Sequence, residues 1–187
     1  MIAYDLPVSV SVGGRDYSIR SDYRAILDII TALNDPDLTQ EDRGAVMLGI
    51  FYPDEIPADV DAAIKECFRF IAGGEERPEK PGPRLVDWSK DFRWIVSPIN
   101  RMLGHDVRSV QMHWWTFLSL YYEIPGDCTF AKIVHIREAR AMGQKLDKAD
   151  RDWLTRNADL VKIEQVYSSE EEDLLKTWTG GGMSNAE

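Results

Sequence analysis

Only one segment of the chain alternates regularly between apolar and polar residues, and it lies near the N-terminus. In LPVSVSVGGRDYSIRSD, three valines alternate with serines up to Gly13 and Gly14, and Tyr17 and Ile19 resume the alternation. A period of two is typical of a β-strand, and two glycines supply the positive φ angles of a tight two-residue turn. The segment therefore predicts a β-hairpin. Because an isolated hairpin is marginally stable in water, we expect helices elsewhere in the chain to cover it.

Apolar residues at helical spacing dominate the rest of the chain. Ser21 and Thr39 are suitable N-caps for two amphipathic helices in the first half, and a third amphipathic helix is expected from Asp59 onward. We expect the third of these helices to end at Gly73 and Gly74, because glycine readily adopts the left-handed conformation that follows a helix.

Three more helices are expected in the second half. One covers 85–104 with a kink at Pro98, one covers 110–122, and one covers 128–142 after an N-cap at Asp127. The sequence contains no internal repeat of the kind that builds a solenoid. The fold class predicted from these patterns is mainly α: a helical bundle with a small N-terminal β-hairpin.

A segment rich in glycine, proline and charge separates the two halves. Residues 73–84, GGEERPEKPGPR, have too little apolar surface to order themselves, so we expect a flexible linker that interrupts a domain over 1–145. Residues 146–187 are expected to form a charged, weakly ordered tail with one or two short helices. The apolar residues that could anchor this tail are Trp153, Leu154, Leu160, Ile163 and Val166.

Composition narrows the classes of partner. The 187 residues include 32 acidic and 22 basic side chains, for a formal net charge of -10. Such a charge repels a phosphate backbone, so we expect no nucleic-acid partner. No apolar run approaches the roughly 20 residues that span a bilayer, and the first residues lack a secretory signal pattern. Cys67 and Cys128 lie far apart, so folding should not need a disulfide, and we expect a reducing cytoplasm.

The longest aromatic segment is VQMHWWTFLSLYYEIPGDC, from Val110 to Cys128. On a helical wheel its apolar side chains cover most of the circumference, which is typical of the central helix of a bundle. A base-stacking surface normally interleaves aromatic residues with Lys or Arg, and the stretch from Val110 to Tyr122 contains neither. We interpret the segment as core and predict that Trp114 is largely buried.

The histidines give no metal-binding pattern. His113 has neither a second histidine nor a carboxylate at helical ligand spacing, and the HExxH motif is absent. We expect His113 to be a satisfied or half-exposed side chain and His105 to lie exposed in a loop.

Cys128 is the strongest candidate nucleophile. It is expected at a helix N-terminus, where the helix dipole lowers a thiol pKa, and His135 follows as a candidate base. However, seven residues of helix rise by about 10 Å, which is too far for a hydrogen bond, and the Asp127 charge opposes a thiolate. A buried, unreactive cysteine is the favoured interpretation.

Acidic and glycine-rich stretches have ordinary structural explanations. The turn that holds Asp54, Glu55, Asp59 and Asp61 lacks EF-hand spacing, and acidic residues favour the start of a helix through its dipole. Residues 170–173 form a charge run typical of a solvated face. The glycine pairs and Gly180 to Gly182 lack a phosphate-binding motif. We therefore predict no catalytic, cofactor-binding or metal-binding residue and no enzymatic activity.

Four segments, in this order, resemble the gene-product-fifteen family of bacteriophages and prophages of Gram-positive bacteria. They are LPVSVSVGGRDYSIRSDYRAILDI, LGIFYPDEIPADVDAAIKECFRFIAGG, VDWSKDFRWIVSPINRMLGHDV and MHWWTFLSLYYEIPGDCTFAKIVHIREA. Together they span roughly residues 5–140. The chain departs from the family pattern in the linker, which tends to be Lys-rich in the family, and after residue 145, where family members usually end sooner.

The resemblance implies a role in phage tail morphogenesis. Its expected activity is that of a non-enzymatic tail assembly chaperone in the host cytoplasm, which binds the tape-measure protein and assists polymerisation of the tail tube. The major tail protein and a second copy of the chain are further candidate partners, and no cofactor or membrane is implied. A minor structural component of the tail and a thiol enzyme using Cys128 stay open as alternatives. The sequence singles out no partner-binding residue, because core and partner-facing aromatic residues look alike.

Overall fold

The computed structural model describes residues 5–75 and 82–163, and in them the fold is mainly α with an N-terminal hairpin, as predicted. The hairpin consists of β1 (Ser9–Val12) and β2 (Arg15–Ser18). The helices are α1 (Tyr23–Leu33), α2 (Gln40–Phe51), α3 (Val60–Ile71), α4 (Trp88–Leu103), the 3-10 helix η1 (Val107–Ser109), α5 (Trp114–Tyr122), α6 (Thr129–Ala141), α7 (Lys148–Arg156) and α8 (Ala158–Val161).

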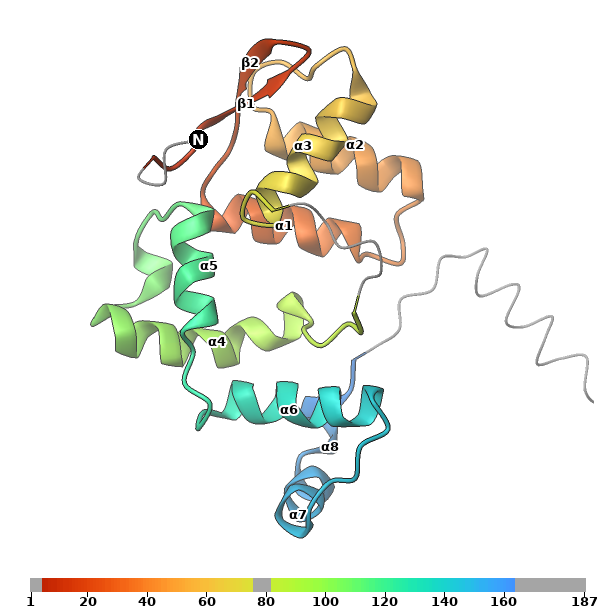
Figure 1. The fold of residues 1–187 in the computed structure, drawn as a ribbon, viewed down its shortest axis with the longest axis vertical. Helices are drawn as coiled ribbons and strands as arrows, with labels where there is room; N and C mark the ends of the chain where they lie inside the picture. Colours follow the sequence, from red (N-terminus) through yellow and green to blue (C-terminus); the bar gives the residue numbers. More distant parts are fainter. Residues whose placement is uncertain (1–4, 76–81, 164–187) are drawn as a thin grey trace, which may run out of the picture.

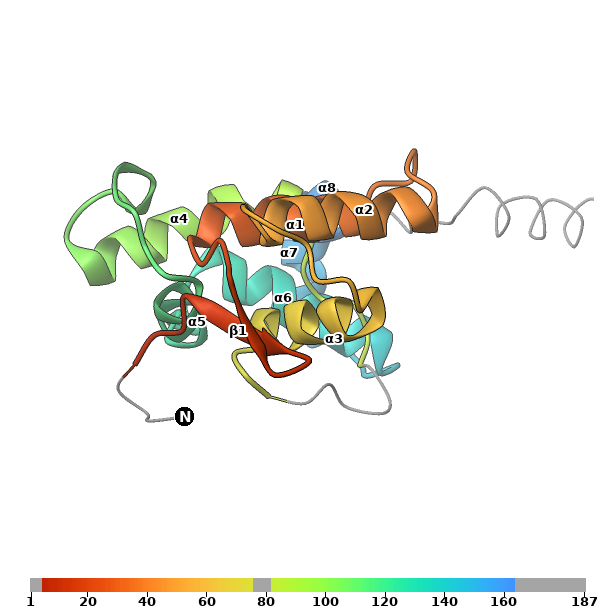
Figure 2. The same ribbon diagram turned by 90° about the horizontal axis from the view of Figure 1, so that it is seen from above.

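The elements follow one another along the long axis of the molecule. Figure 1 shows the hairpin and α1 to α3 at one end, α4 and α5 in the middle, and α6 to α8 at the other end. Helix α1 packs against α2, α4 and α5, α4 also contacts α6, and α6 contacts α8. Seen from above, α1, α2 and α4 lie along one side, and the hairpin, α3 and α5 lie along the other (Figure 2).

The hairpin forms as its sequence predicts. Gly13 and Gly14 have φ angles of 60° and 80°, so both adopt the left-handed conformation of a two-residue turn. Val10 and Val12 are buried, and β1 packs against α3. Val8 belongs to the same alternation but is 64% exposed; it precedes β1 and lies outside the core, which begins at Val10.

One of the two N-caps predicted in the first half is confirmed, since the Thr39 hydroxyl accepts the Asp42 N–H at 3.1 Å. The third helix starts where it is expected, and the Asp59 carboxylate caps it by accepting the Ala62 N–H at 3.1 Å. The first helix is capped by Asp22 instead of Ser21. Tertiary contact explains this shift, since the Ser21 carbonyl accepts the N–H of Trp114 at 2.7 Å.

All three helix starts in the second half also differ from expectation, and helix α4 begins at Trp88, not at residue 85, with Asp87 as its N-cap. Helix α5 begins at Trp114, not at residue 110. The residues before it are extended because Met112 C=O accepts the Tyr23 N–H at 2.9 Å and Asp22 forms a β-bridge with His113. Helix α6 is capped by Cys128, not by Asp127.

Helix ends follow the sequence signals more closely. Helix α3 ends before Gly73 and Gly74, whose φ angles are 77° and 91°, and Gly74 N–H closes the end by donating to Arg69 C=O at 2.8 Å. Pro98 lies inside α4 and does not interrupt it. None of the described helices is long and apolar enough to cross a bilayer.

Part of the predicted linker and most of the predicted tail lie outside the described residues. These parts are 76–81 and 164–187, which include Val166, the charge run at 170–173 and Gly180 to Gly182. The described start of the tail forms α7 and α8, and Val161 is buried against the rest of the protein. The division into a domain over 1–145 and a tail stays a prediction.

Candidate functional site

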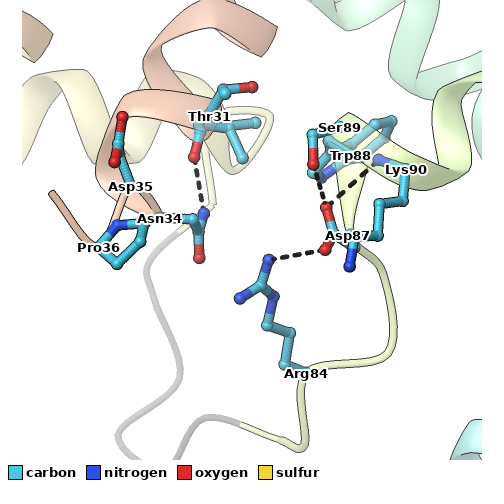
Figure 3. A pocket seen from close by; sticks show the side chains of 10 residues that line it. Thr31, Asn34, Asp35, Pro36, Arg84, Asp87, Trp88, Ser89 and Lys90 are labelled. Atoms are coloured by element: carbon cyan, nitrogen blue, oxygen red, sulfur yellow. Dashed lines mark hydrogen bonds and ion pairs between the residues drawn. The ribbon is translucent and has the colours of Figure 1, made fainter. Parts of the chain in front are cut away.

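A cleft of about 240 Å³ lies between the C-terminal end of α1 and the N-terminal end of α4 (Figure 3). Its central carboxylate, Asp87, caps α4: it accepts the Ser89 hydroxyl at 2.6 Å and the Lys90 N–H at 3.4 Å, and Arg84 lies 3.7 Å away. Burial would raise the pKa of Asp87, yet these hydrogen bonds and charges together lower it. The Asp87 carboxylate is thus engaged in capping α4.

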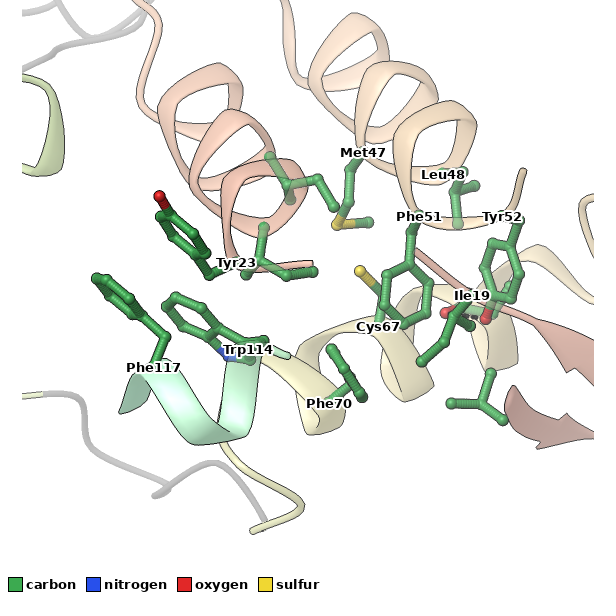
Figure 4. Packing of buried hydrophobic residues seen from close by; sticks show 14 of the residues in the cluster. Ile19, Tyr23, Met47, Leu48, Phe51, Tyr52, Cys67, Phe70, Trp114 and Phe117 are labelled. Atoms are coloured by element: carbon green, nitrogen blue, oxygen red, sulfur yellow. Dashed lines mark hydrogen bonds between the residues drawn. The ribbon is translucent and has the colours of Figure 1, made fainter. Parts of the chain in front are cut away.

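The aromatic segment lies in the core, as predicted (Figure 4). Trp114 is 1% exposed, and its ring stacks on Phe117 with centroids 5.7 Å apart. Phe117 in turn stacks on Tyr23 at 4.7 Å. Tyr122, at the C-terminal end of α5, is 75% exposed, so the helix meets solvent along one side while its other apolar side chains pack on the core.

Two indole N–H groups from this segment bind the end of α3. The Trp114 Nε1–H donates to Ile71 C=O at 2.9 Å, and the Trp115 Nε1–H donates to Phe70 C=O at 2.9 Å. The last carbonyls of a helix have no partner within it, so the two tryptophans satisfy acceptors that would otherwise need water. No local sequence signal indicates this contact, because the partners lie more than forty positions apart.

His113 is a satisfied structural residue, as predicted. Its Nδ1 accepts the Trp115 N–H at 3.1 Å and so caps α5, while Nε2 lies 2.9 Å from Pro7 C=O. A ring protonated at Nε2 fulfils both contacts, which leaves neither nitrogen free for a metal. His105 is exposed, and no group of three His, Cys, Asp or Glu side chains in the described residues could hold a metal ion.

The structure does not bring Cys128 and His135 together. Cys128 Sγ accepts the Ala131 N–H at 3.4 Å, and His135 Nε2 lies 3.0 Å from the Asp150 carboxylate on α7. Lys132 binds the same carboxylate. The histidine thus joins α6 to α7 instead of serving the thiol. The other cysteine, Cys67, is fully buried, and this burial raises its pKa to about 12.

The acidic turn before α3 is also structural. Glu55 forms a bidentate ion pair with Arg15 at the tip of the hairpin, with distances of 3.0 and 2.6 Å, and Asp59 caps α3. The turn therefore ties the α2–α3 connection to the hairpin.

A buried ion pair that no local sequence pattern indicates joins α6 to α4. The Arg137 guanidinium binds both carboxylate oxygens of Asp91, with an Nη2–Oδ1 distance of 3.1 Å, and the two side chains are almost fully buried. Its remaining N–H groups donate to the carbonyls of Leu85, Leu160 and Val161 at 2.9 to 3.0 Å. No buried side-chain nitrogen or oxygen in the described residues lacks a partner.

A second groove, of about 230 Å³, lies between β1, the C-terminal half of α3 and α5. Ser9 and Ser11 line it from the hairpin, Phe70 and Arg69 from α3, and Trp115 from α5. Among the clefts described, this one combines aromatic side chains with exposed backbone of a β-strand.

These features define a mainly α protein with an N-terminal hairpin, in which His113, Cys128 and Asp59 cap helices and Trp114 packs in the core. The family model described as Bacteriophage Gp15 protein matches residues 2–163. The chain belongs to this bacteriophage family. The match extends beyond residues 5–140, which carried the resemblance, and includes α7 and α8. No curated protein and no solved structure matched the chain.

Proposed function

We propose that this phage protein is a tail assembly chaperone. In this role it binds the tape-measure protein in the host cytoplasm, keeps it soluble and assists polymerisation of tail-tube subunits around it. The observation that carries the proposal is membership of the phage family over residues 2–163. The role in the tail comes from the resemblance of the four segments quoted above.

Surface features support a binding role. Apolar side chains that are 44 to 64% exposed surround the hairpin and the start of α3: Leu6, Val8, Ile56 and Val60. The nearby groove adds the half-buried ring of Trp115. Exposed apolar groups of this size are common on surfaces that meet another protein, and the net charge of -10 favours a basic partner.

A non-enzymatic role fits the same geometry. Cys128 and His135 have separate partners, and the buried charges of Arg137 and Asp91 satisfy each other. These groups serve the fold and leave no assembled pair of nucleophile and base in the described residues. Binding without a cofactor is therefore the activity we assign.

Co-purification tests the proposal directly. The full chain and its cognate tape-measure protein would be expressed separately and together, and the soluble fractions compared by size-exclusion chromatography at micromolar concentration. We expect co-elution and a larger soluble yield of the tape-measure protein when the two are expressed together. Absence of co-elution would contradict the proposal.

Virion composition separates the chaperone from the alternative of a minor structural component of the tail. A chaperone leaves the particle, so mass spectrometry of purified virions should find this chain absent or far below the copy number of tail proteins. A fixed stoichiometric amount in the virion would favour the structural role.

A further inference from the structure

Strand β1 has one edge that no other element of the described structure covers with hydrogen bonds. The Ile19 N–H donates to Val8 C=O at 3.0 Å, and Val10 and Val12 face Tyr17 and Arg15 in the register of the hairpin. In an antiparallel ladder, hydrogen-bonded pairs alternate with non-bonded pairs. Every second residue of β1 therefore points its N–H and C=O away from β2.

Those outward residues are Ser9 and Ser11. In the described parts of the chain, no hydrogen bond engages the backbone groups of either serine on the outer edge, and both residues are exposed. A row of unpaired N–H and C=O groups is a template for another strand. Along the four residues of β1, outward N–H and C=O groups recur at every second residue, which is the pattern that pairs with an extended partner chain.

The edge lies beside a preformed aromatic wall. The Trp115 ring stacks on Phe70 with centroids 5.7 Å apart and is held by the hydrogen bond from its Nε1–H to Phe70 C=O. Gly74 lets the chain pass close to this ring, since a Cβ there would lie 3.1 Å from it. The wall and the edge of β1 face the same groove, and Figure 2 shows β1 on the same side of the molecule as α3.

The charges of the groove select among extended chains. Glu66 is paired with Arg69 at 3.0 Å, whereas the carboxylate of Asp16 has no ion-pair partner among the residues described. An added strand places alternate side chains on opposite faces. Apolar side chains on one face would meet the half-buried Trp115 ring, which stacks on the buried Phe70, and basic side chains on the other would meet Asp16.

We propose that β1 binds an extended segment of a partner protein by strand addition, and that this segment alternates apolar and basic residues. The inference rests on the proposed function for the identity of the partner, the tape-measure protein, but not for the existence of the site. Main-chain hydrogen bonds to Ser9 and Ser11 supply affinity, and the contacts with Trp115 and Asp16 supply selectivity.

A pair of proline variants tests the edge itself. Ser11→Pro removes an outward N–H from β1 without removing a bond between the strands, and Ser18→Pro makes the same change on the opposite edge of the hairpin. The probe is a short synthetic peptide of alternating lysine and valine, followed by NMR of the full chain. We expect shifts at the amides of Ser9 and Ser11, about tenfold weaker binding by Ser11→Pro, and less than about twofold change for Ser18→Pro.

Charge and partner are tested separately. Asp16→Lys should weaken binding of the lysine–valine peptide, and a glutamate–valine peptide should bind poorly to the wild type. Equal binding of both peptides, or equal effects of the two proline variants, would overturn the strand-addition proposal. So would a wild-type dimer that Ser11→Pro converts to a monomer, because a second copy would then occupy the edge.

The tape-measure protein separates this inference from the proposed function. If it co-elutes equally well with the wild type and with Ser11→Pro, the tape-measure protein uses another surface, so strand addition by this partner is refuted and the chaperone role stands. If the peptide binds at Ser9 and Ser11 but the tape-measure protein does not co-elute with the wild type, the site stands and the chaperone role is refuted.

Discussion

Replacing Trp114 by alanine tests whether the aromatic segment is the centre of the core. The side chain is 1% exposed, contacts Phe117 and Trp88, and donates a hydrogen bond to Ile71 C=O. Truncating a buried tryptophan costs about 3–5 kcal/mol through lost burial and the cavity that remains. In a chain of this size, that corresponds to a fall in Tm of roughly 6–20 °C.

The assay is urea unfolding followed by far-UV circular dichroism, because the other tryptophans would complicate fluorescence. Tyr122→Ala is the matched control: it removes an aromatic ring from the same helix, but that ring is 75% exposed and should cost less than about 0.5 kcal/mol. Trp114→Phe keeps a ring and loses the N–H, so we expect about 1–2 kcal/mol. A loss below about 1 kcal/mol for Trp114→Ala, or equal losses for Trp114→Ala and Tyr122→Ala, would refute the core assignment.

Three further predictions concern charged and thiol groups. Arg137→Ala leaves Asp91 buried without its counter-charge, so the free energy of unfolding should fall by about 3–5 kcal/mol in urea titrations; a fall below about 1 kcal/mol would mean that Asp91 finds solvent. Burial and the raised pKa of Cys67 should keep it unreactive toward a thiol reagent at neutral pH until the protein unfolds, whereas the half-buried Cys128 reacts earlier; equal rates would contradict this order. The hydrogen bond from Lys132, with that from His135, holds the pKa of Asp150 below its ordinary value of 3.8. The stabilisation is therefore present above about pH 4 and is lost as the pH falls through the lowered pKa, and Asp150→Asn should lack this component when unfolding is measured against pH.

Local rules account for the parts of the fold that the sequence predicts well. The hairpin depends on alternation and on Gly13 and Gly14, all within a few residues. The caps at Thr39 and Asp59 depend on side chains that reach the next N–H groups of their own helices. Such contacts need no knowledge of the rest of the chain.

The errors arise where distant residues compete with local signals. The pattern from Val110 onward favours a helix, yet Met112 C=O accepts the Tyr23 N–H and Ser21 C=O accepts the Trp114 N–H, and these bonds hold the stretch extended. The cap position moves to Asp22 for the same reason.

The candidate binding site can be recognised only once the tertiary structure is known. Ser9 and Ser11 look like ordinary polar positions of a strand, and only the register shows that their backbone groups face outward. Trp115 could not be separated from Trp114 by spacing, although one is half-buried beside the groove and the other is fully buried.

The guanidinium of Arg137 also links two distant segments of the chain. It holds Leu85, near the start of the second described part of the chain, together with Leu160 and Val161, near its end. One side chain on α6 therefore satisfies carbonyl groups of two segments that lie far apart in the sequence. Removing the guanidinium should expose these carbonyls to solvent at both segments, so the backbone before α4 and that of α8 should gain hydrogen exchange together.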